Sequence, residues 1–180
     1  MNPVRNLSNR ERLSKKERVG MKGISNGAKK QPIIAVIGGN KCSNKVEQLA
    51  HKIGKIVAKV GAILVCGGLG GVMEASCKGA KSEKGLTIGI LPSQEKTSAN
   101  SFVDIALPTG LGYSRNVLVV KSADIVIAID GKYGTLSEIA YALHFKKPTF
   151  GIGTWNIKGV IKIASLIDLE NRIRKIIKNL

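Results

Sequence analysis

Short apolar runs alternate with amphipathic stretches along most of the chain. Runs with the length and composition of buried strands occupy residues 33–37, 62–66, 86–90, 125–129 and 148–152, with weaker strand signals at 102–106 and 160–163. Between them, apolar residues recur at helical spacing. Apolar strands that alternate with helices are typical of a parallel sheet covered on both faces. The pattern predicts one doubly wound, Rossmann-like α/β domain with a mainly parallel sheet.

The expected helices lie between these strands, at residues 46–60, 72–81, 113–122, 135–145 and from 166 onward. Ser165 and Asp168 have the spacing of a capping box for the last one. In a doubly wound fold, each strand-to-helix loop emerges at the carboxyl edge of the sheet, where ligands bind. The loops GGN, GGLGG, PTGLGYSR and DGKYGT are therefore expected at one edge.

Two glycine-rich loops follow strands and open helices, which favours anion binding because glycine permits close approach and a helix start offers free N–H groups. The candidate phosphate-binding residues in these loops are Gly38, Gly39, Gly67, Gly68, Gly70 and Gly71. Tight turns without a ligand are the alternative. The second loop is not a dinucleotide fingerprint, because Met73 stands at the position of its third glycine. No loop in the chain has the GxxxxGK[ST] pattern of a P-loop.

Two charged residues are expected at the same edge. Glu138 follows Thr135 at capping-box spacing, so it can bond the backbone at a helix start. Arg115 lies in the first turn of another expected helix, and this placement favours a second interpretation. In that interpretation, Arg115 holds phosphate or ribose oxygens, and Glu138 stabilises an oxocarbenium ion or activates water. Both interpretations of Glu138 remain open on the sequence.

Three segments, GGLGGVMEASCKGA, TGLGYSRNVLVVKSADIVIAI and GKYGTLSEIAYAL, resemble the LOG (Lonely Guy) and lysine-decarboxylase-like superfamily, whose fingerprint is PGGxGTxxE. The similarity covers about residues 32–165, and the most similar branch contains small bacterial proteins akin to the molybdenum-cofactor carrier protein. The resemblance implies that Arg115 and Glu138 match the family's catalytic pair. It also implies that Gly131, Gly134 and Thr135 match its phosphate loop.

LOG enzymes cleave the N-glycosidic bond of nucleoside 5′-monophosphates, so the resemblance implies a metal-independent phosphoribohydrolase with no required cofactor. The alternative is a noncatalytic carrier or sensor of a nucleotide or a phosphorylated pterin, with molybdenum cofactor as the carried ligand. The chain departs from the fingerprint at two positions, where Asp130 replaces Pro and Lys132 replaces the second Gly. Lys132 either adds a contact to the phosphate or blocks the loop.

The resemblance also implies a homodimer or tetramer, because LOG-like proteins associate through helices beside this edge. The expected helix 135–145 carries Ile139, Leu143 and Phe145 alongside Tyr141. This is more apolar surface than one face of a sheet needs. We therefore expect self-association through this helix.

The chain has a formal net charge of +17. Residues 1–30 hold nine lysines and arginines against two acidic residues and show no apolar period, which predicts a disordered basic arm ahead of a nucleotide-binding domain at 31–180. Such an arm can contact nucleic-acid phosphates nonspecifically. Aromatic residues, which stack on bases, make up 4% of the chain, so a solvated tail is the interpretation we adopt.

The cysteines and histidines indicate no metal site. The 3 cysteines form no CxxC pair, and the 2 histidines are not spaced to join them as zinc ligands, so buried free thiols are expected. The apolar runs are far shorter than the roughly 20 residues of a membrane helix. No secretory signal core follows the basic N-terminal residues. From these features we expect a soluble cytoplasmic protein.

Overall fold

The computed structural model describes residues 30–180, so the expected basic arm lies, apart from Lys30, outside the described residues. A 7-stranded sheet has the order β4-β3-β2-β1-β5-β6-β7, and all of its neighbouring strands pair in parallel. The first half of the chain extends the sheet from one side of β1 with β2, β3 and β4, and the second half extends it from the other side with β5, β6 and β7. The prediction of a doubly wound α/β fold is confirmed.

The strands are β1 (Ile33–Gly38), β2 (Ile63–Cys66), β3 (Thr87–Leu91), β4 (Ile105–Pro108), β5 (Ile125–Ile129), β6 (Thr149–Ile152) and β7 (Ile161–Lys162). The helices are α2 (Asn44–Lys59), α3 (Val72–Ser82), α4 (Asn116–Lys121), α5 (Tyr133–His144) and α6 (Leu166–Ile177). Two 3-10 helices, η2 (Lys96–Ser98) and η3 (Gly112–Arg115), lie in the connections. Most of these elements begin within two or three residues of the sequence prediction.

Two predicted elements differ from the structure. The strand expected at 102–106 begins at Ile105, because the residues before it form a turn in which the Phe102 N–H donates to the Asn100 side chain. The helix expected at 113–122 is divided into η3 and α4, which meet at Arg115. The predicted cap of α6 is confirmed, since the Ser165 side chain accepts from the Asp168 N–H.

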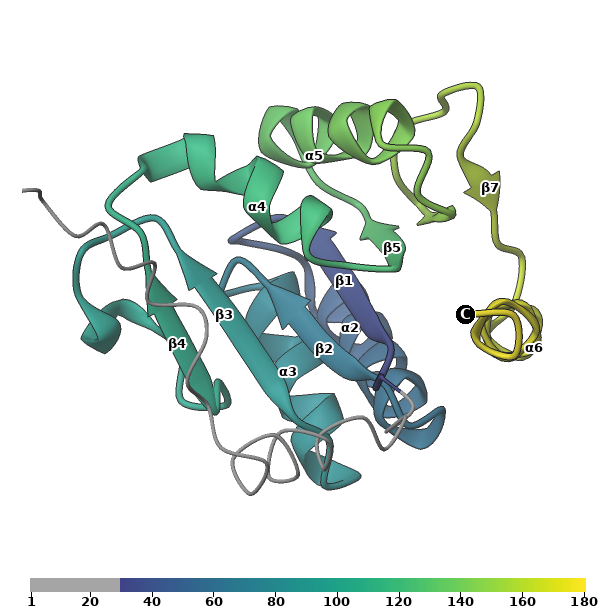
Figure 1. Cartoon of the computed structure of the whole chain (residues 1–180), viewed down its shortest axis with the longest axis horizontal. Coiled ribbons are helices and arrows are strands. Elements are labelled where there is room, and N and C mark those ends of the chain that lie inside the picture. The colour runs from purple at the N-terminus through teal and green to yellow at the C-terminus, as the bar shows by residue number, and fades with distance from the viewer. Residues whose placement is uncertain (1–29) are drawn as a thin grey trace, which may run out of the picture. The chain divides into compact units, whose positions relative to one another are not determined.

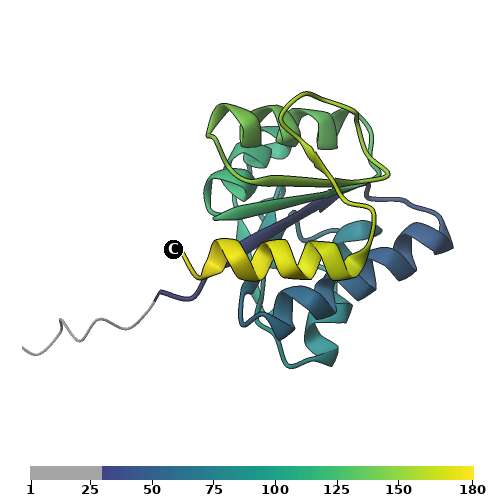
Figure 2. The same ribbon diagram turned by 90° about the vertical axis from the view of Figure 1, so that its right-hand side faces the viewer.

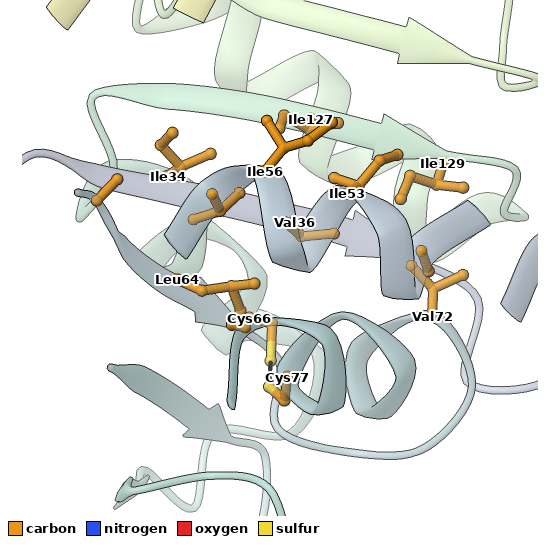
Figure 3. Packing of buried hydrophobic residues seen from close by; sticks show 14 of the residues in the cluster. Ile34, Val36, Ile53, Ile56, Leu64, Cys66, Val72, Cys77, Ile127 and Ile129 are labelled. Carbon is orange, nitrogen blue, oxygen red and sulfur yellow. Dashed lines mark hydrogen bonds between the residues drawn. The ribbon is translucent and has the colours of Figure 1, made fainter. Parts of the chain in front are cut away.

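The sheet lies between two layers of helices (Figure 1). Helices α2, α3 and α6 supply buried residues to the core on one face, and α4 and α5 supply those on the other. Figure 2 shows α6 on the same side of the sheet as α2. In Figure 3, Ile53 and Ile56 of α2 pack against strand residues that include Val36 and Ile127. Apolar residues at helical spacing in α2 therefore face the sheet, as the sequence predicts.

Helices α2 and α3 approach closely because each has a glycine at the crossing. A Cβ at Gly54 would overlap the Ser76 carbonyl, and one at Gly79 would overlap the His51 carbonyl. Two predicted free thiols also lie in this layer. Cys66 of β2 and Cys77 of α3 are buried and free, and their sulfur atoms lie 3.5 Å apart. Figure 3 shows the two side chains pointing toward each other.

The order of the strands places a topological switch point between β1 and β5, from which the chain winds in opposite directions. Loops that follow such strands separate from each other and leave a crevice where ligands bind. Within residues 30–180, no helix is long and apolar enough to span a membrane.

Candidate functional site

A cavity of about 430 Å³ lies at this switch point and is here called the first cavity. The loops after β1, β2 and β5 line it, together with residues of η3 and α5. Of the residues predicted for the site, the structure brings together Gly38, Gly39, Gly67, Arg115, Gly131, Lys132, Gly134, Thr135 and Glu138. Its volume suits a ligand the size of a mononucleotide.

Three predicted phosphate-binding glycines do not line the first cavity. The Gly68 N–H donates to the Cys66 sulfur at 3.3 Å, and the Gly70 N–H donates to the Asn40 side-chain oxygen at 2.9 Å. Gly71 has a φ of 60°, and a Cβ there would overlap the loop after β1. The GGLGG loop therefore uses these glycines to position α3 against the loop after β1.

The loop after β5 presents free backbone donors to the first cavity. In the part of the chain that the structure describes, no protein acceptor receives the N–H groups of residues 131–135. Helix α5 begins in this loop, with Lys132 as its N-cap and no capping side chain. Free N–H groups at a helix N-terminus, aligned with the helix dipole, form an anion-binding site.

The side chains of the 131–135 loop leave room for an anion. Gly131 has a φ of 97°, and a Cβ there would overlap the Thr135 side chain. Thr135 is 3% exposed, and its hydroxyl has no hydrogen-bond partner among residues 30–180. A Cβ at Gly134 would meet no atom within 4 Å, so the approach to its N–H is open. Lys132 is exposed and lines the cavity beside these donors.

The two departures from the fingerprint have different structural consequences. Asp130 has a φ of 48°, and its N–H donates to the Ile152 carbonyl at 3.2 Å. Proline fits neither this φ nor this hydrogen bond, so the loop differs in shape from a Pro-Gly-Gly loop. Lys132 has a φ of −114° and a ψ of −151°, an extended conformation open to any residue.

Arg115 and Glu138 meet in the first cavity, where each is 6% exposed. The Arg115 Nη1 lies 3.8 Å from the Glu138 Oε1 and donates to the Asn116 side-chain oxygen at 2.6 Å. Its Nη2 donates to the Gly67 carbonyl at 3.1 Å. Among the described residues, the buried Nε of Arg115 has no acceptor. The guanidinium is fixed by its neighbours and keeps a donor free.

The interpretation of Glu138 as a helix cap is wrong. Helix α5 begins at Tyr133, so Thr135 is already helical and Glu138 lies in the second turn without bonding the backbone. Burial raises the pKa of the Glu138 carboxyl to about 8, and the nearby positive charge of Arg115 offsets this effect only in part. The carboxyl is therefore mostly neutral at pH 7.

Asn116, which is not among the residues predicted for the site, connects the guanidinium to the start of α5. Its amide oxygen accepts from Arg115, and its amide nitrogen donates to the Ser137 hydroxyl at 3.3 Å. Ser137 in turn donates to the Gly134 carbonyl at 2.7 Å. Nothing in the sequence around Asn116 indicates this role, because the chain of bonds joins two helices that are separate in the sequence.

No metal centre is evident in the described part of the chain. Within residues 30–180, no group of three or more His, Cys, Asp or Glu side chains lies close enough together to hold a metal ion.

Solved structures of high similarity include two proteins whose ligand is named. The molybdenum cofactor binding protein from Rippkaea orientalis is 36% identical, with a TM-score of 0.78 over 83% of this chain and 99% of that chain. The molybdenum cofactor carrier protein from Chlamydomonas reinhardtii is 32% identical, with a TM-score of 0.75 over 82% of this chain and 99% of that chain. An uncharacterized protein of Archaeoglobus fulgidus is 49% identical over 110 residues, 61% of this chain and 72% of that protein.

The family model of the SLOG cluster4 family matches residues 31–177, which include every residue that lines the first cavity. The match spans the whole sheet and every helix within residues 30–180. The resemblance of the sequence to the LOG superfamily is thereby confirmed. The chain belongs to the SLOG cluster4 family.

Proposed function

We propose that this protein binds a phosphorylated small molecule in the first cavity and carries it without cleaving it, with molybdenum cofactor as the carried ligand. One observation carries the proposal: the N–H groups of residues 131–135 have no acceptor within the described residues, and all of these residues except Tyr133 line the first cavity at the start of α5. The Thr135 hydroxyl and the Lys132 ammonium lie in the same loop. A phosphate there accepts from backbone, hydroxyl and ammonium together.

The charges around the first cavity favour an anionic ligand. Lys41, Arg115 and Lys132 line it, against the carboxylate of Asp130 and the mostly neutral carboxyl of Glu138. Arg115 keeps its buried Nε without an acceptor among the described residues, and a buried unpaired donor is costly until a ligand or water pairs with it. Positive charge in a cleft also raises the local concentration of an anion.

The state of Glu138 favours carriage over hydrolysis. Cleavage of an N-glycosidic bond passes through a transition state with oxocarbenium character, which an ionised carboxylate stabilises. A carboxyl with a pKa near 8 is mostly neutral at pH 7 and supplies little of that charge. Arg115 is also held by Gly67 and Asn116. At pH 7 the pair therefore offers hydrogen bonds to a ligand, with little negative charge to stabilise an oxocarbenium ion.

We choose a pterin, molybdenum cofactor, as the carried ligand because of the two solved relatives described above. Each is named for molybdenum cofactor and resembles this chain over more than four fifths of its length. The phosphate of that cofactor would occupy the 131–135 loop. A nucleoside monophosphate satisfies the same donors and remains the second candidate ligand.

Calorimetry with AMP and GMP against adenosine and guanosine tests the phosphate site. The nucleotides should bind at least about tenfold more tightly than the nucleosides, and Lys132→Gln should weaken nucleotide binding by about 1 to 3 kcal/mol, as for a hydrogen bond to a charged group. Lys175→Gln removes an exposed charge from α6, outside the cavity, and should leave the affinity unchanged. Equal affinity for nucleotides and nucleosides would contradict the proposal.

A further inference from the structure

A second cavity, of about 570 Å³, lies between α2, the carboxyl ends of β5 and β6, and the start of α6. Leu49 and Ile152, both partly buried, give it apolar walls. Lys45, Lys52 and Asp130 supply its charges, and neither lysine forms an ion pair with any residue of the described range 30–180. A planar ring fits such a site, because its faces contact apolar walls while its polar edge meets the charged groups.

Asp130 lines both the first and the second cavity. Its backbone is fixed on both sides, since its N–H donates to the Ile152 carbonyl and its carbonyl accepts from the Thr154 hydroxyl at 2.6 Å. No donor within residues 30–180 hydrogen-bonds its carboxylate, and no basic side chain there pairs with it. Asp130 therefore lies where the two cavities adjoin, and its carboxylate has no hydrogen-bond donor among residues 30–180.

The free carboxylate of Asp130 pairs best with a heterocycle that has two hydrogen-bond donors side by side on one edge. An ionised carboxylate is an acceptor only, with two oxygens side by side. The 2-amino-4-oxopyrimidine ring, common to pterins and guanine, presents an amino group and a ring N–H side by side, so both donate to one carboxylate. Adenine presents its amino group beside a ring acceptor, which a carboxylate repels.

We propose that the second cavity holds the 2-amino-4-oxopyrimidine ring of the ligand and that Asp130 pairs with its amino and N–H edge. This inference rests on the proposed function, since it assumes that the phosphate occupies the 131–135 loop. Asp130 lines both cavities and directly precedes that loop, so the ring site and the phosphate site adjoin at this residue. The aspartate that replaces the fingerprint proline then selects the ring, while the loop after it holds the phosphate.

Binding of GMP and AMP to the wild type and to Asp130→Asn tests this selection. Asparagine also tolerates a positive φ, so the loop should keep its shape. Wild type should bind GMP at least about tenfold more tightly than AMP, and Asp130→Asn should reduce that ratio to near one. Glu95→Gln removes an exposed carboxylate outside both cavities and should keep the wild-type ratio. An unchanged ratio in Asp130→Asn would overturn the proposal.

A second variant and a second ligand test whether the 2-amino-4-oxopyrimidine ring lies in the second cavity. Gln48 is exposed on α2 and lines the second cavity, so Gln48→Trp should narrow it without disturbing the core. This variant should weaken GMP binding and leave the binding of inorganic phosphate unchanged; undiminished GMP binding would place the ring elsewhere. Unphosphorylated 6-hydroxymethylpterin, followed by its fluorescence, should compete with guanosine in the wild type and lose affinity in Asp130→Asn.

The outcomes separate this inference from the proposed function. If the wild type binds GMP more tightly than guanosine but binds GMP and AMP equally, the proposed phosphate site stands and the proposed ring site is refuted. If the wild type binds GMP more tightly than AMP but binds each nucleotide no more tightly than its nucleoside, the proposed ring site stands and the proposed phosphate site is refuted.

Discussion

The Arg115 guanidinium lies 3.8 Å from the Glu138 carboxyl, and both side chains are buried where they line the first cavity. Burial disfavours the charged form of each. Because an arginine stays protonated in proteins, the carboxyl is the partner that becomes neutral. The cavity is therefore lined by a fixed positive charge and a carboxyl that ionises only in mildly alkaline solution.

The raised pKa of Glu138 predicts a loss of stability as pH rises. Its pKa is about 8 in the folded protein against an ordinary value of 4.5, so between these values the unfolded carboxyl ionises while the folded one keeps its proton. The free energy of unfolding therefore falls as pH rises through this window. Glu138→Gln has no such loss, so urea denaturation should show its stability relative to wild type rising from about pH 5 to about pH 8. A constant difference would contradict the raised pKa.

Gly134→Ala should separate ligand binding from stability. A Cβ at Gly134 meets no protein atom within 4 Å, and alanine favours a helix over glycine by about 0.5 to 1 kcal/mol. The free energy of unfolding should be unchanged or higher. A methyl group beside the free N–H groups should nevertheless weaken nucleotide binding by about tenfold or more, since phosphate contacts of this kind need close backbone approach. Unchanged affinity would place the phosphate elsewhere.

Gly54→Ala should have the opposite effect on stability. The substitution favours the helix locally, but the new Cβ overlaps the Ser76 carbonyl where α2 and α3 cross. Overpacking of this kind costs about 1 to 3 kcal/mol. Urea denaturation should show that loss, with Gly134→Ala as the matched glycine-to-alanine control. A stabilised Gly54→Ala variant would show that the two helices separate without cost.

We propose self-association through α4 and α5, although the structure changes the residues involved. Ile139 is fully buried against its own sheet, whereas Leu118 and Tyr141 are 38% and 40% exposed. The double variant Leu118→Glu and Tyr141→Glu should halve the mass of the wild-type dimer in light scattering. Ile167→Glu, at a 76% exposed position on α6, should leave it unchanged. A monomeric wild type at micromolar concentration would refute this proposal.

The sequence predicts the central strands well, because strands buried on both faces are apolar throughout. Runs such as 33–37 and 125–129 have no polar interruption and are fully or almost fully buried in the structure. The edge strand β4 was predicted less accurately. Its residues alternate between exposed and partly buried, and the hydrogen bonds of Asn100, rather than local propensity, decide where it begins.

The candidate site was predicted in part. Arg115, Glu138 and the loop after β5 do meet in one cavity, because parallel strands bring their carboxyl ends to the same edge. The GGLGG loop shows the limit of such reasoning, since Asn40, 30 residues away, accepts the N–H of Gly70. The second cavity was not predicted, because it depends on where α6 lies relative to α2, and the sequence holds no local signal for that arrangement.

The most direct test of the central claim follows the fate of a bound nucleotide. Purified protein is incubated with GMP or AMP until binding is complete, the protein is then denatured, and the released compounds are separated by chromatography. Recovery of intact nucleotide, with no free base above a protein-free control, is the result expected of a carrier. Free base and ribose 5-phosphate formed by wild type and abolished in Glu138→Gln would contradict the claim and establish a phosphoribohydrolase.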